Sequence, residues 1–404
     1  MTFPYVVQRG DTLYRIARRF AINMSALQSA NPQIENFDYI VPGQVIQIPV
    51  RRDNLYVIQA GDTFYRIAQR FNIALNDLIA ANPNVDPTRL QIGQTIVLPI
   101  SVGETIVDTT GPYGYDELVE DIGALGSRYP FLQTGLIGES VLGRKIPVII
   151  FGRGPKTLHY NGSFHANEWI TTPLLMKFVE ELARAFAGDG NLRGTNVHEL
   201  YDQVTLWIVP MVNPDGVELV LNGITPDNPF YDRVISWNNG SFNFQGWKVN
   251  IRGVDLNDQF PANWEVEKER RSPAGPAPRD YVGEAPLTEP EAIAIAALTQ
   301  NEDFRLVIAF HTQGEVIFWN YRDLEPPESE QIVNRFQQVS GYTPMQIFNS
   351  DAGYKDWFIQ DFRRPGFTVE AGRGVNPLPI SQFPQIYEDV VGIMLEGMKA
   401  AQTL

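Results

Sequence analysis

Residues 157–169 read Thr-Leu-His-Tyr-Asn-Gly-Ser-Phe-His-Ala-Asn-Glu-Trp, a strand-like stretch followed at once by a His-x-x-Glu pair. His165 and Glu168 therefore fall on a loop or helix start at a strand end, where sites gather in α/β sheets. His311 directly follows another strand-like run, residues 305–310. Two imidazoles and one carboxylate suit a catalytic zinc ion, which keeps one position for water. These three residues are the predicted metal ligands.

The sequence around this stretch predicts a three-layer α/β domain. Runs beginning at Lys145, Val204 and Arg305 are continuously apolar, as expected of strands covered on both faces. Helical patterns beginning at Thr172 and Thr288 lie between these runs. This alternation predicts helices on both sides of a largely parallel or mixed sheet, within residues 111–404.

The chain opens with an internal repeat. The segment Tyr5-Val-Val-Gln-Arg-Gly-Asp-Thr-Leu-Tyr-Arg-Ile-Ala recurs from Tyr56 as Tyr-Val-Ile-Gln-Ala-Gly-Asp-Thr-Phe-Tyr-Arg-Ile-Ala. Each copy predicts a short strand, a helix after Gly-Asp, a second short helix ending at Asn-Pro, and a closing strand. We expect two βααβ modules at residues 3–50 and 54–100, followed by a linker at 101–110.

The repeats closely resemble the LysM module, which has Gly-Asp-Thr, Ala-Asn-Pro and a Gly-Gln-x-Ile ending at the same places. The resemblance implies binding to glycans that contain N-acetylglucosamine, as in peptidoglycan. The same Asp and Thr side chains can cap the helix that follows, and we expect that capping role to dominate. The residues that the resemblance places near the glycan are Gly10, Asp11, Thr12, Gly61, Asp62 and Thr63.

Composition narrows the partners and the chemistry. A formal charge of −15 argues against nucleic acid or an anionic membrane as a partner. The absence of cysteine excludes disulfides and thiolate chemistry. The N-terminus shows neither the basic start nor the apolar run of a secretory signal. We therefore expect a cytoplasmic enzyme, or one associated with the wall after release by a non-classical route; the sporulating-cell alternative rests on the family resemblance given below.

Four further motifs accompany the metal ligands in order: Asn213-Pro-Asp-Gly, Gly253-Val-Asp-Leu-Asn, Phe310-His-Thr and Phe367-Thr-Val-Glu-Ala. Together they resemble the zinc carboxypeptidase family, the carboxypeptidase A-like peptidases, over residues 111–404. The resemblance implies one Zn²⁺ bound by His165, Glu168 and His311. It also implies that Glu370 is the general base and proton shuttle, and that Asp255 accepts a proton from His165.

The family also needs a cation that stabilises the tetrahedral oxyanion. In the family this cation is an arginine that follows an aromatic residue, and the aligned pair in this chain is Trp247-Lys248. Arg252 lies close by in the sequence, and its guanidinium donates in a fixed fork. Both candidates stay open, with a slight preference for Arg252.

The sequence departs from the carboxypeptidase pattern at the substrate-binding positions. Carboxypeptidases carry Asn-Arg, and the arginine clamps the terminal carboxylate of the substrate, whereas this chain carries Asn257-Asp258. An anion there disfavours a free C-terminus and favours an ammonium group or an uncharged continuation of the substrate. Phe348 falls near the position of the mobile tyrosine of the family, and Tyr354 is a candidate substitute. Lys355 falls where the family sets side-chain specificity, which indicates either an acidic group on the substrate or a surface lysine.

LysM repeats followed by a carboxypeptidase-like domain with Asn-Asp resemble the bacterial γ-D-glutamyl-L-diamino acid endopeptidases, some of which are linked to sporulation and made without a signal peptide. The resemblance implies cleavage of the peptidoglycan stem peptide between D-glutamate and a diamino acid such as meso-diaminopimelate. Two alternatives stay open. One is a zinc carboxypeptidase that trims muropeptides, and the other is an inert wall-binding protein.

Overall fold

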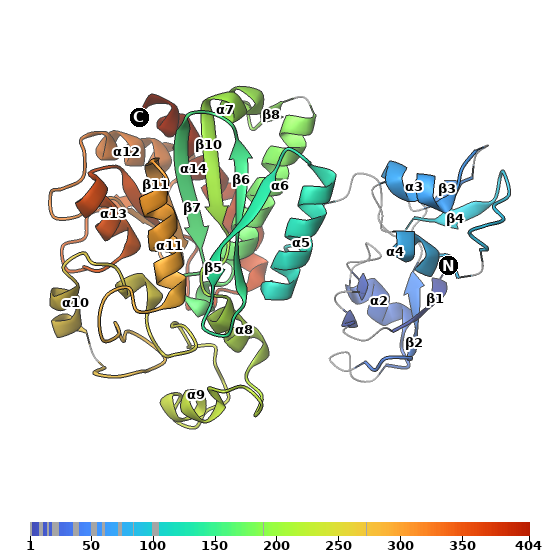
Figure 1. Ribbon diagram of the computed structural model, residues 1–404, viewed down its shortest axis with the longest axis horizontal. Helices are drawn as coiled ribbons and strands as arrows, with labels where there is room; N and C mark the ends of the chain where they lie inside the picture. The colour runs from blue at the N-terminus through green and yellow to red at the C-terminus, as the bar shows by residue number, and fades with distance from the viewer. Residues whose placement is uncertain are drawn as a thin grey trace. The chain divides into compact units, whose positions relative to one another are not determined.

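The computed structural model describes residues 2–7, 11–13, 16–17, 24–34, 40–49, 55–58, 61–71, 75–83, 85–98, 105–188, 190–271 and 273–404. The chain divides into two compact units, Met1–Ile106 and Val107–Leu404 (Figure 1). Residues 101–104 of the expected linker lie outside the described residues.

The first unit contains the two repeats as separate small sheets with helices. In the first repeat, β1 (Thr2–Val6) pairs antiparallel with β2 (Val45–Pro49), and α2 (Met24–Ala30) lies between them in sequence. In the second repeat, β3 (Leu55–Val57) pairs antiparallel with β4 (Thr95–Val97), and α3 (Phe64–Phe71) and α4 (Leu75–Ala80) intervene. The βααβ order that the repeat predicts is confirmed in the second copy.

One buried asparagine ties the helix to the closing strand in each repeat. Asn31 donates to the carbonyls of Leu27 and Gln47 and accepts a hydrogen bond from the Gln47 amide, at 2.8, 2.7 and 2.6 Å. Asn82 makes the equivalent contacts with Leu78 and Val97. The Asn-Pro motif therefore has a structural role, because its amide satisfies backbone groups that would otherwise be buried without partners.

The second unit is built on an eight-stranded mixed sheet in the order β13-β12-β14-β11-β7-β10-β6-β5. The four central strands, β14, β11, β7 and β10, run parallel, and antiparallel pairs lie on either side of them. The mixed sheet predicted from the alternating pattern is confirmed. The strands are β5 (Gln133–Glu139), β6 (Lys145–Gly152), β7 (Lys156–Gly162), β10 (Val204–Val209), β11 (Phe304–His311), β12 (Val316–Phe318), β13 (Thr343–Met345) and β14 (Gly366–Glu370).

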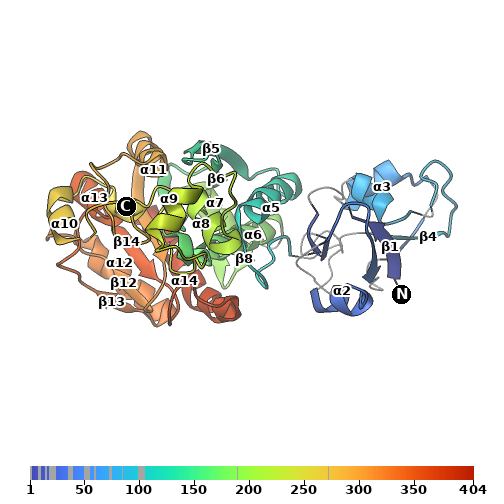
Figure 2. The same ribbon diagram turned by 90° about the horizontal axis from the view of Figure 1, so that it is seen from below.

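Helices cover both faces of this sheet (Figure 2). Helices α6 (Thr171–Ala187), α12 (Glu328–Ser340) and α14 (Phe383–Thr403) lie on one face, with α5 (Tyr115–Arg128) beside α6. Helices α11 (Pro290–Asn301) and α13 (Tyr354–Phe362) lie on the other. The shorter elements are η2 (Ala166–Glu168), β8 (Asn191–Leu192), β9 (Thr195–Asn196), α7 (Val197–Gln203), α8 (Pro214–Asn222), α9 (Tyr231–Trp237), η3 (Leu256–Asp258), α10 (Trp264–Arg270) and η4 (Ile380–Gln382).

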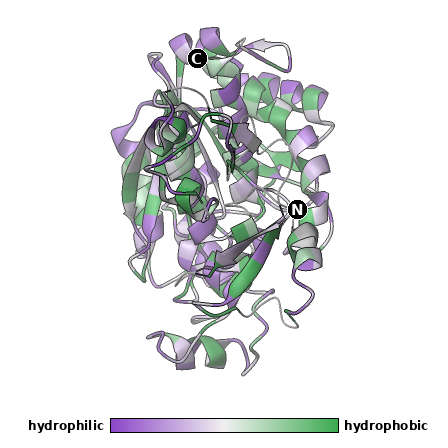
Figure 3. Cartoon of the chain, turned by 90° about the vertical axis from the view of Figure 1, so that its right-hand side faces the viewer, coloured by the Kyte–Doolittle hydropathy of each residue, from purple (hydrophilic) through white to green (hydrophobic). Residues whose placement is uncertain are grey.

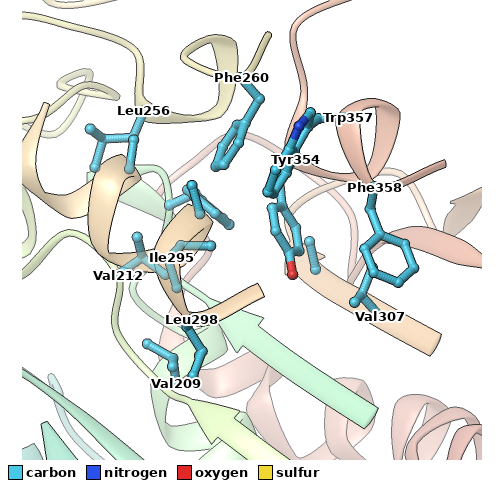
Figure 4. Close-up of a cluster of buried hydrophobic side chains, with 14 of the residues drawn as sticks. Val209, Val212, Leu256, Phe260, Ile295, Leu298, Val307, Tyr354, Trp357 and Phe358 are labelled. Carbon is cyan, nitrogen blue, oxygen red and sulfur yellow. The ribbon is translucent and has the colours of Figure 1, made fainter. Parts of the chain in front are cut away.

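Strand β11 shows why its run of apolar residues is continuous. Val307 and Ala309 join the hydrophobic cluster beneath α11 and α13, part of which Figure 4 shows. Phe310 packs edge-on against Tyr160, whose hydroxyl donates to a carbonyl of α14 on the opposite face, Met394 O, at 2.7 Å. Alternate residues of a strand point to opposite faces, so a strand covered by helices on both sides needs apolar residues at every position.

Helices of the chain carry hydrophobic and hydrophilic residues side by side, as expected of helices with one buried face (Figure 3). None of the helices in the described ranges combines the length and the apolar character that crossing a bilayer requires. The parallel strands β7, β11 and β14 end at Gly162, His311 and Glu370. The carboxyl ends of three parallel strands therefore lie at the same edge of the sheet, and His311 and Glu370 end two of them.

Candidate metal centre

The three predicted ligands converge at this edge. His165 caps the start of η2, Glu168 is its last residue, and His311 ends β11. Nδ1 of His165 lies 2.9 Å from Oε1 of Glu168, and Nδ1 of His311 lies 3.0 Å from Oε2 of the same carboxylate. The two Nδ1 atoms are 3.1 Å apart. All three side chains are buried, and together they form a group that could hold a metal ion.

The arrangement suits a divalent cation. Nitrogen and oxygen ligands of zinc lie about 2.0–2.2 Å from the ion, so the atoms of one shell lie near each other, as these three do. A buried carboxylate beside two facing imidazole nitrogens needs a positive charge to compensate its burial. A His₂Glu set also leaves a position for water, which is the composition of a catalytic site.

Asp255 orients the first of these imidazoles. Its Oδ1 lies 3.1 Å from Nε2 of His165, which places the ring proton on Nε2 and leaves Nδ1 for the metal. Its Oδ2 lies 2.7 Å from Nζ of Lys248. Burial alone would raise the pKa of Asp255, but Lys248 and His165 outweigh burial and hold that pKa well below its usual value. The expected partner of His165 is therefore a fixed anion.

Asn376 was not found by sequence reasoning. Its Nδ2 donates to Oε1 of Glu168 at 3.2 Å and to the carbonyl of Thr312 at 2.8 Å. The Thr312 amide donates to the other oxygen of Glu168, also at 3.2 Å. These two donors fix the orientation of the carboxylate. No local pattern marks Asn376, because it comes from a loop 208 residues away from Glu168.

Glu370 ends β14 and pairs in register with His311 at the end of the neighbouring strand β11. Burial, and then the negative charge of Glu168, raise the pKa of Glu370 to about 8, while His165 and Lys248 act in the opposite sense. A cation held by the three ligands would lower this pKa. A carboxyl group with a pKa near the working pH can both take and return a proton.

Lys248, and not Arg252, lies next to the metal cluster. The Lys248 ammonium contacts Asp255, and its charge acts on the ionisation of His165, His311 and Glu370. The side chain of Arg252 is 45% exposed, and its nearest acid is Glu289, at 3.6 Å. The slight preference for Arg252 is corrected, because the loop directs its guanidinium to another carboxylate.

Asp258 does not offer a free carboxylate to an ammonium group. The residue is only 3% exposed, and Oδ2 lies 3.3 Å from Nε of Arg271. Burial and the nearby Asp255 raise its pKa to about 7, against the opposing effect of Lys248 and Arg271. The expectation of a direct ammonium clamp at Asp258 is therefore corrected. The buried side chain instead supports the guanidinium of Arg271.

Lys355 is also not available to bind a substrate, because it is buried and paired. It is 5% exposed, its ammonium donates to the carbonyl of Asn320 at 2.7 Å, and it is paired with Asp356. The ammonium also lies 5.8 Å from the centre of the Tyr321 ring. Neither of the two predicted roles fits, because Lys355 is neither at the surface nor free to bind an acidic group.

Tyr354 belongs to the hydrophobic core and cannot replace a mobile tyrosine. Its ring packs against Phe260 and Trp357 (Figure 4), and its hydroxyl lies 2.9 Å from Oγ1 of Thr299. Phe348, at the position of the mobile residue in the sequence comparison, is 69% exposed. Asn257 is partly buried, and its Oδ1 lies 3.5 Å from the Tyr354 amide.

The acidic side chains of the repeats have partners inside their own modules. Oδ2 of Asp11 accepts a hydrogen bond from the Tyr5 hydroxyl at 2.7 Å, and Asp62 accepts one from Tyr56 at 2.6 Å. In the second module, Thr63 Oγ1 accepts from the Arg66 amide, as a helix cap does. Gly61 has φ +85°, a left-handed conformation that favours glycine. Thr12 is exposed, and Gly10 lies outside the described residues.

Comparison with known families agrees with this geometry. The zinc carboxypeptidase family model matches residues 118–391, and the LysM domain model matches residues 5–49 and 56–99. The fold and the His-Glu-His group are those of a zinc metallopeptidase. The chain belongs to the zinc carboxypeptidase family and carries two LysM domains at its N-terminal end.

Two relatives extend over nearly the whole chain. The chain is 51% identical to "Gamma-D-glutamyl-L-diamino acid endopeptidase 1" of Lysinibacillus sphaericus, over 85% of this chain and 99% of the relative. It is 38% identical to "Uncharacterized protein YqgT" of Bacillus subtilis (strain 168), over 96% of both chains.

Solved structures support the fold. Thrombin activatable fibrinolysis inhibitor superposes with a TM-score of 0.59 at 19% identity, over 74% of this chain and 80% of that chain. Carboxypeptidase A from Helicoverpa armigera superposes with a TM-score of 0.55 at 16% identity, over 94% and 95%.

Proposed function

We propose that this protein is a peptidoglycan hydrolase that cleaves the amide bond between γ-D-glutamate and the diamino acid, meso-diaminopimelate, of the stem peptide. The observation that carries the proposal is a complete His-Glu-His centre combined with a buried aspartate, Asp258, in place of the arginine that clamps a free C-terminus. The relative that is 51% identical bears the name of that activity, and it supports the same substrate class.

The chemistry assigned to the site is hydrolysis with one Zn²⁺ held by His165, Glu168 and His311. When bound, the ion supplies a Lewis acid and lowers the pKa of a water to about 7. Glu370 takes the proton of the attacking water and returns it to the leaving amine. Lys248 donates to the oxyanion from a position fixed by Asp255, at 2.7 Å.

The LysM domains are proposed to hold the enzyme on wall glycan that contains N-acetylglucosamine. Two weak glycan sites raise the effective concentration of a linked enzyme along its polymer substrate. The glycine and threonine positions of the Gly-Asp-Thr loops are proposed to approach the glycan, since both aspartates already bind a tyrosine hydroxyl.

Product analysis tests the proposal. Purified protein is incubated with L-Ala-γ-D-Glu-meso-diaminopimelate tripeptide and with the tetrapeptide that continues with D-alanine, and the products are identified by mass spectrometry. We expect release of L-Ala-D-Glu from both peptides, and no release after treatment with a chelator. Glu370→Gln should lower kcat by roughly 10²–10⁴ while zinc content measured by metal analysis stays unchanged.

Three results would contradict the proposal. Loss of the terminal D-alanine alone would show a carboxypeptidase that trims muropeptides. Full activity in the chelated protein would show that the His-Glu-His centre is not used, and loss of zinc in the Glu370 variant would show that Glu370 is a ligand and not the base.

A further inference from the structure

A pair of opposite charges lies beside the metal centre and has no role in the chemistry above. Arg271 follows the last residue of α10, and Asp280 lies in the segment that leads toward α11. Nη1 of Arg271 lies 3.6 Å from Oδ1 of Asp280, and the two side chains are 32% and 31% exposed. Both charges are therefore accessible from solvent.

A series of direct contacts joins this pair to the metal ligands. Asp280 Oδ1 lies 3.4 Å from Nζ of Lys248, which contacts Asp255, the partner of His165. The backbone holds the same segment in place, because the Lys248 amide donates to the carbonyl of Pro278 at 2.9 Å. The pair therefore lies three direct contacts from His165, one of the predicted metal ligands.

The Arg271 guanidinium is supported from behind by two buried carboxylates. Its Nε lies 2.6 Å from Oε1 of Glu267 and 3.3 Å from Oδ2 of Asp258, and both acids are at most 3% exposed. Among the described residues, no ion pair or hydrogen bond engages Nη2. The fork is thus held rigidly with one face available to a ligand, which reduces the entropy lost on binding.

Asp280 is held in an unusual conformation. Its φ is +63°, in the left-handed region that few residues other than glycine, asparagine and aspartate adopt. Such conformations persist where the surrounding structure enforces them, and they cluster at functional sites. Here the conformation keeps the carboxylate between two cations, Lys248 and Arg271.

The two charges complement a zwitterion. A guanidinium binds a carboxylate with paired, charge-assisted hydrogen bonds, and an aspartate beside it accepts an ammonium group. On the basis of the proposed function, we propose that Arg271 and Asp280 bind the carboxylate and the ammonium group at the side-chain end of the leaving diamino acid. Lysine ends in an ammonium group alone, so this site selects a diamino-dicarboxylic acid over lysine.

The proposal assigns the recognition that Asp258 and Lys355 cannot provide. Both of these side chains are at most 5% exposed, and both have partners within the protein. Asp258 becomes a positioning residue, since it acts through Arg271. In this proposal Arg271, which directly follows α10, supplies a guanidinium that position 258 lacks.

Three soluble tripeptides test the proposal with the full-length zinc enzyme. They are L-Ala-γ-D-Glu-meso-diaminopimelate, the same peptide amidated on the side-chain carboxyl, and the L-lysine counterpart. The wild type should cleave the first with a kcat/KM roughly 10–100-fold above the other two, because only the first offers a carboxylate to Arg271. This arm needs no variant, and equal rates on all three peptides would overturn the proposal.

Variants then show which residue is responsible for the preference for diaminopimelate. Arg271→Gln should raise KM for the diaminopimelate peptide about 10–100-fold with kcat within about threefold, and leave the other two peptides nearly unchanged. Arg271→Lys, which keeps the charge but not the fork, should recover part of the loss. Asp280→Asn, which tolerates the same φ, should weaken all three peptides, because each carries the ammonium group.

Arg153→Gln is the matched control, since it removes a surface guanidinium that is 71% exposed at the other end of the sheet. It should change none of the three rates. An Arg271→Gln enzyme that keeps the wild-type preference for diaminopimelate would refute the proposal. A wild type that cleaves none of the three peptides would refute the proposed function instead, so the two failures are distinguishable.

Discussion

At the scale of single residues, the side chains around the metal centre determine which atoms of the predicted ligands can bind the ion. Asp255 takes the Nε2 proton of His165, and Asn376 together with the Thr312 amide fixes the carboxylate of Glu168. The three ligands therefore meet with their orientation already set. Partners of this kind commonly change metal affinity or activity by 10–100-fold when they are removed.

The two cations near the centre make different predictions. Lys248→Gln should lower kcat by about 10²–10³, because a donor fixed beside the metal ligands is lost. Arg252→Gln should change kcat by less than about threefold, because the Arg252 guanidinium is half exposed and faces Glu289. Steady-state kinetics on the tripeptide measures kcat for both variants. The zinc content of each variant is the control, because it shows whether Asp255 still holds His165 in place for the metal.

The opposite ranking would contradict this assignment. A large loss of kcat in Arg252→Gln with little change in Lys248→Gln would show that the loop moves to deliver the guanidinium to the oxyanion. The preference based on guanidinium geometry would then be restored.

At the scale of elements, α11 carries a buried carboxylic acid that links it to the turn between β5 and β6. Glu291 is fully buried, and Oε1 accepts a hydrogen bond from the Val141 amide at 3.1 Å. Burial is the main effect that raises the pKa of Glu291 to about 7, and Asp215 and Glu289 add to it. The folded protein therefore favours the neutral acid at this position.

The raised pKa gives stability a defined pH dependence. The neutral acid stabilises the fold fully below pH 4.5, the ordinary pKa, and this stabilisation is lost as pH rises to about 7. The difference corresponds to about 3 kcal/mol in the free energy of unfolding. Glu291→Gln, which stays neutral, should remove that decline and be more stable than the wild type at pH 8 relative to pH 5.

Denaturant unfolding at pH 5 and pH 8 measures this effect. All seven tryptophans lie between residues 169 and 357, so their fluorescence reports on the second unit alone. An identical pH dependence in the wild type and the variant would show that Glu291 is ionised in the folded protein throughout this range.

At the scale of the whole molecule, the proposed function assigns glycan binding to the first unit and hydrolysis to the second. Removing residues 1–100 should leave cleavage of the soluble tripeptide within about twofold and reduce solubilisation of intact sacculi at least tenfold, because the glycan tether is lost. The release of peptides from sacculi and from tripeptide is measured side by side. Equal losses on both substrates would show that the first unit stabilises the second instead of tethering it.

The sequence by itself determined the chemistry and the topology that presents it. The predicted ligands and Glu370 follow strand-like runs, and the carboxyl ends of neighbouring parallel strands must meet at one edge of a sheet. The repeats were readable because each module pairs its own first and last strands within about fifty residues, and Asn31 and Asn82 each bond inside their own copy. Local sequence is informative wherever the contacts are local.

Only the tertiary structure decided which charges a substrate can reach. Lys355 and Tyr354 follow the family pattern in sequence, but packing buries both. Asp258 and Arg271 are thirteen positions apart, and Asp280 reaches Lys248 across a loop. Exposure and pairing depend on neighbours brought from distant parts of the chain, and no local pattern encodes them. The sequence motifs thus predict zinc-dependent hydrolysis, whereas packing decides which charged side chains stay accessible to a substrate.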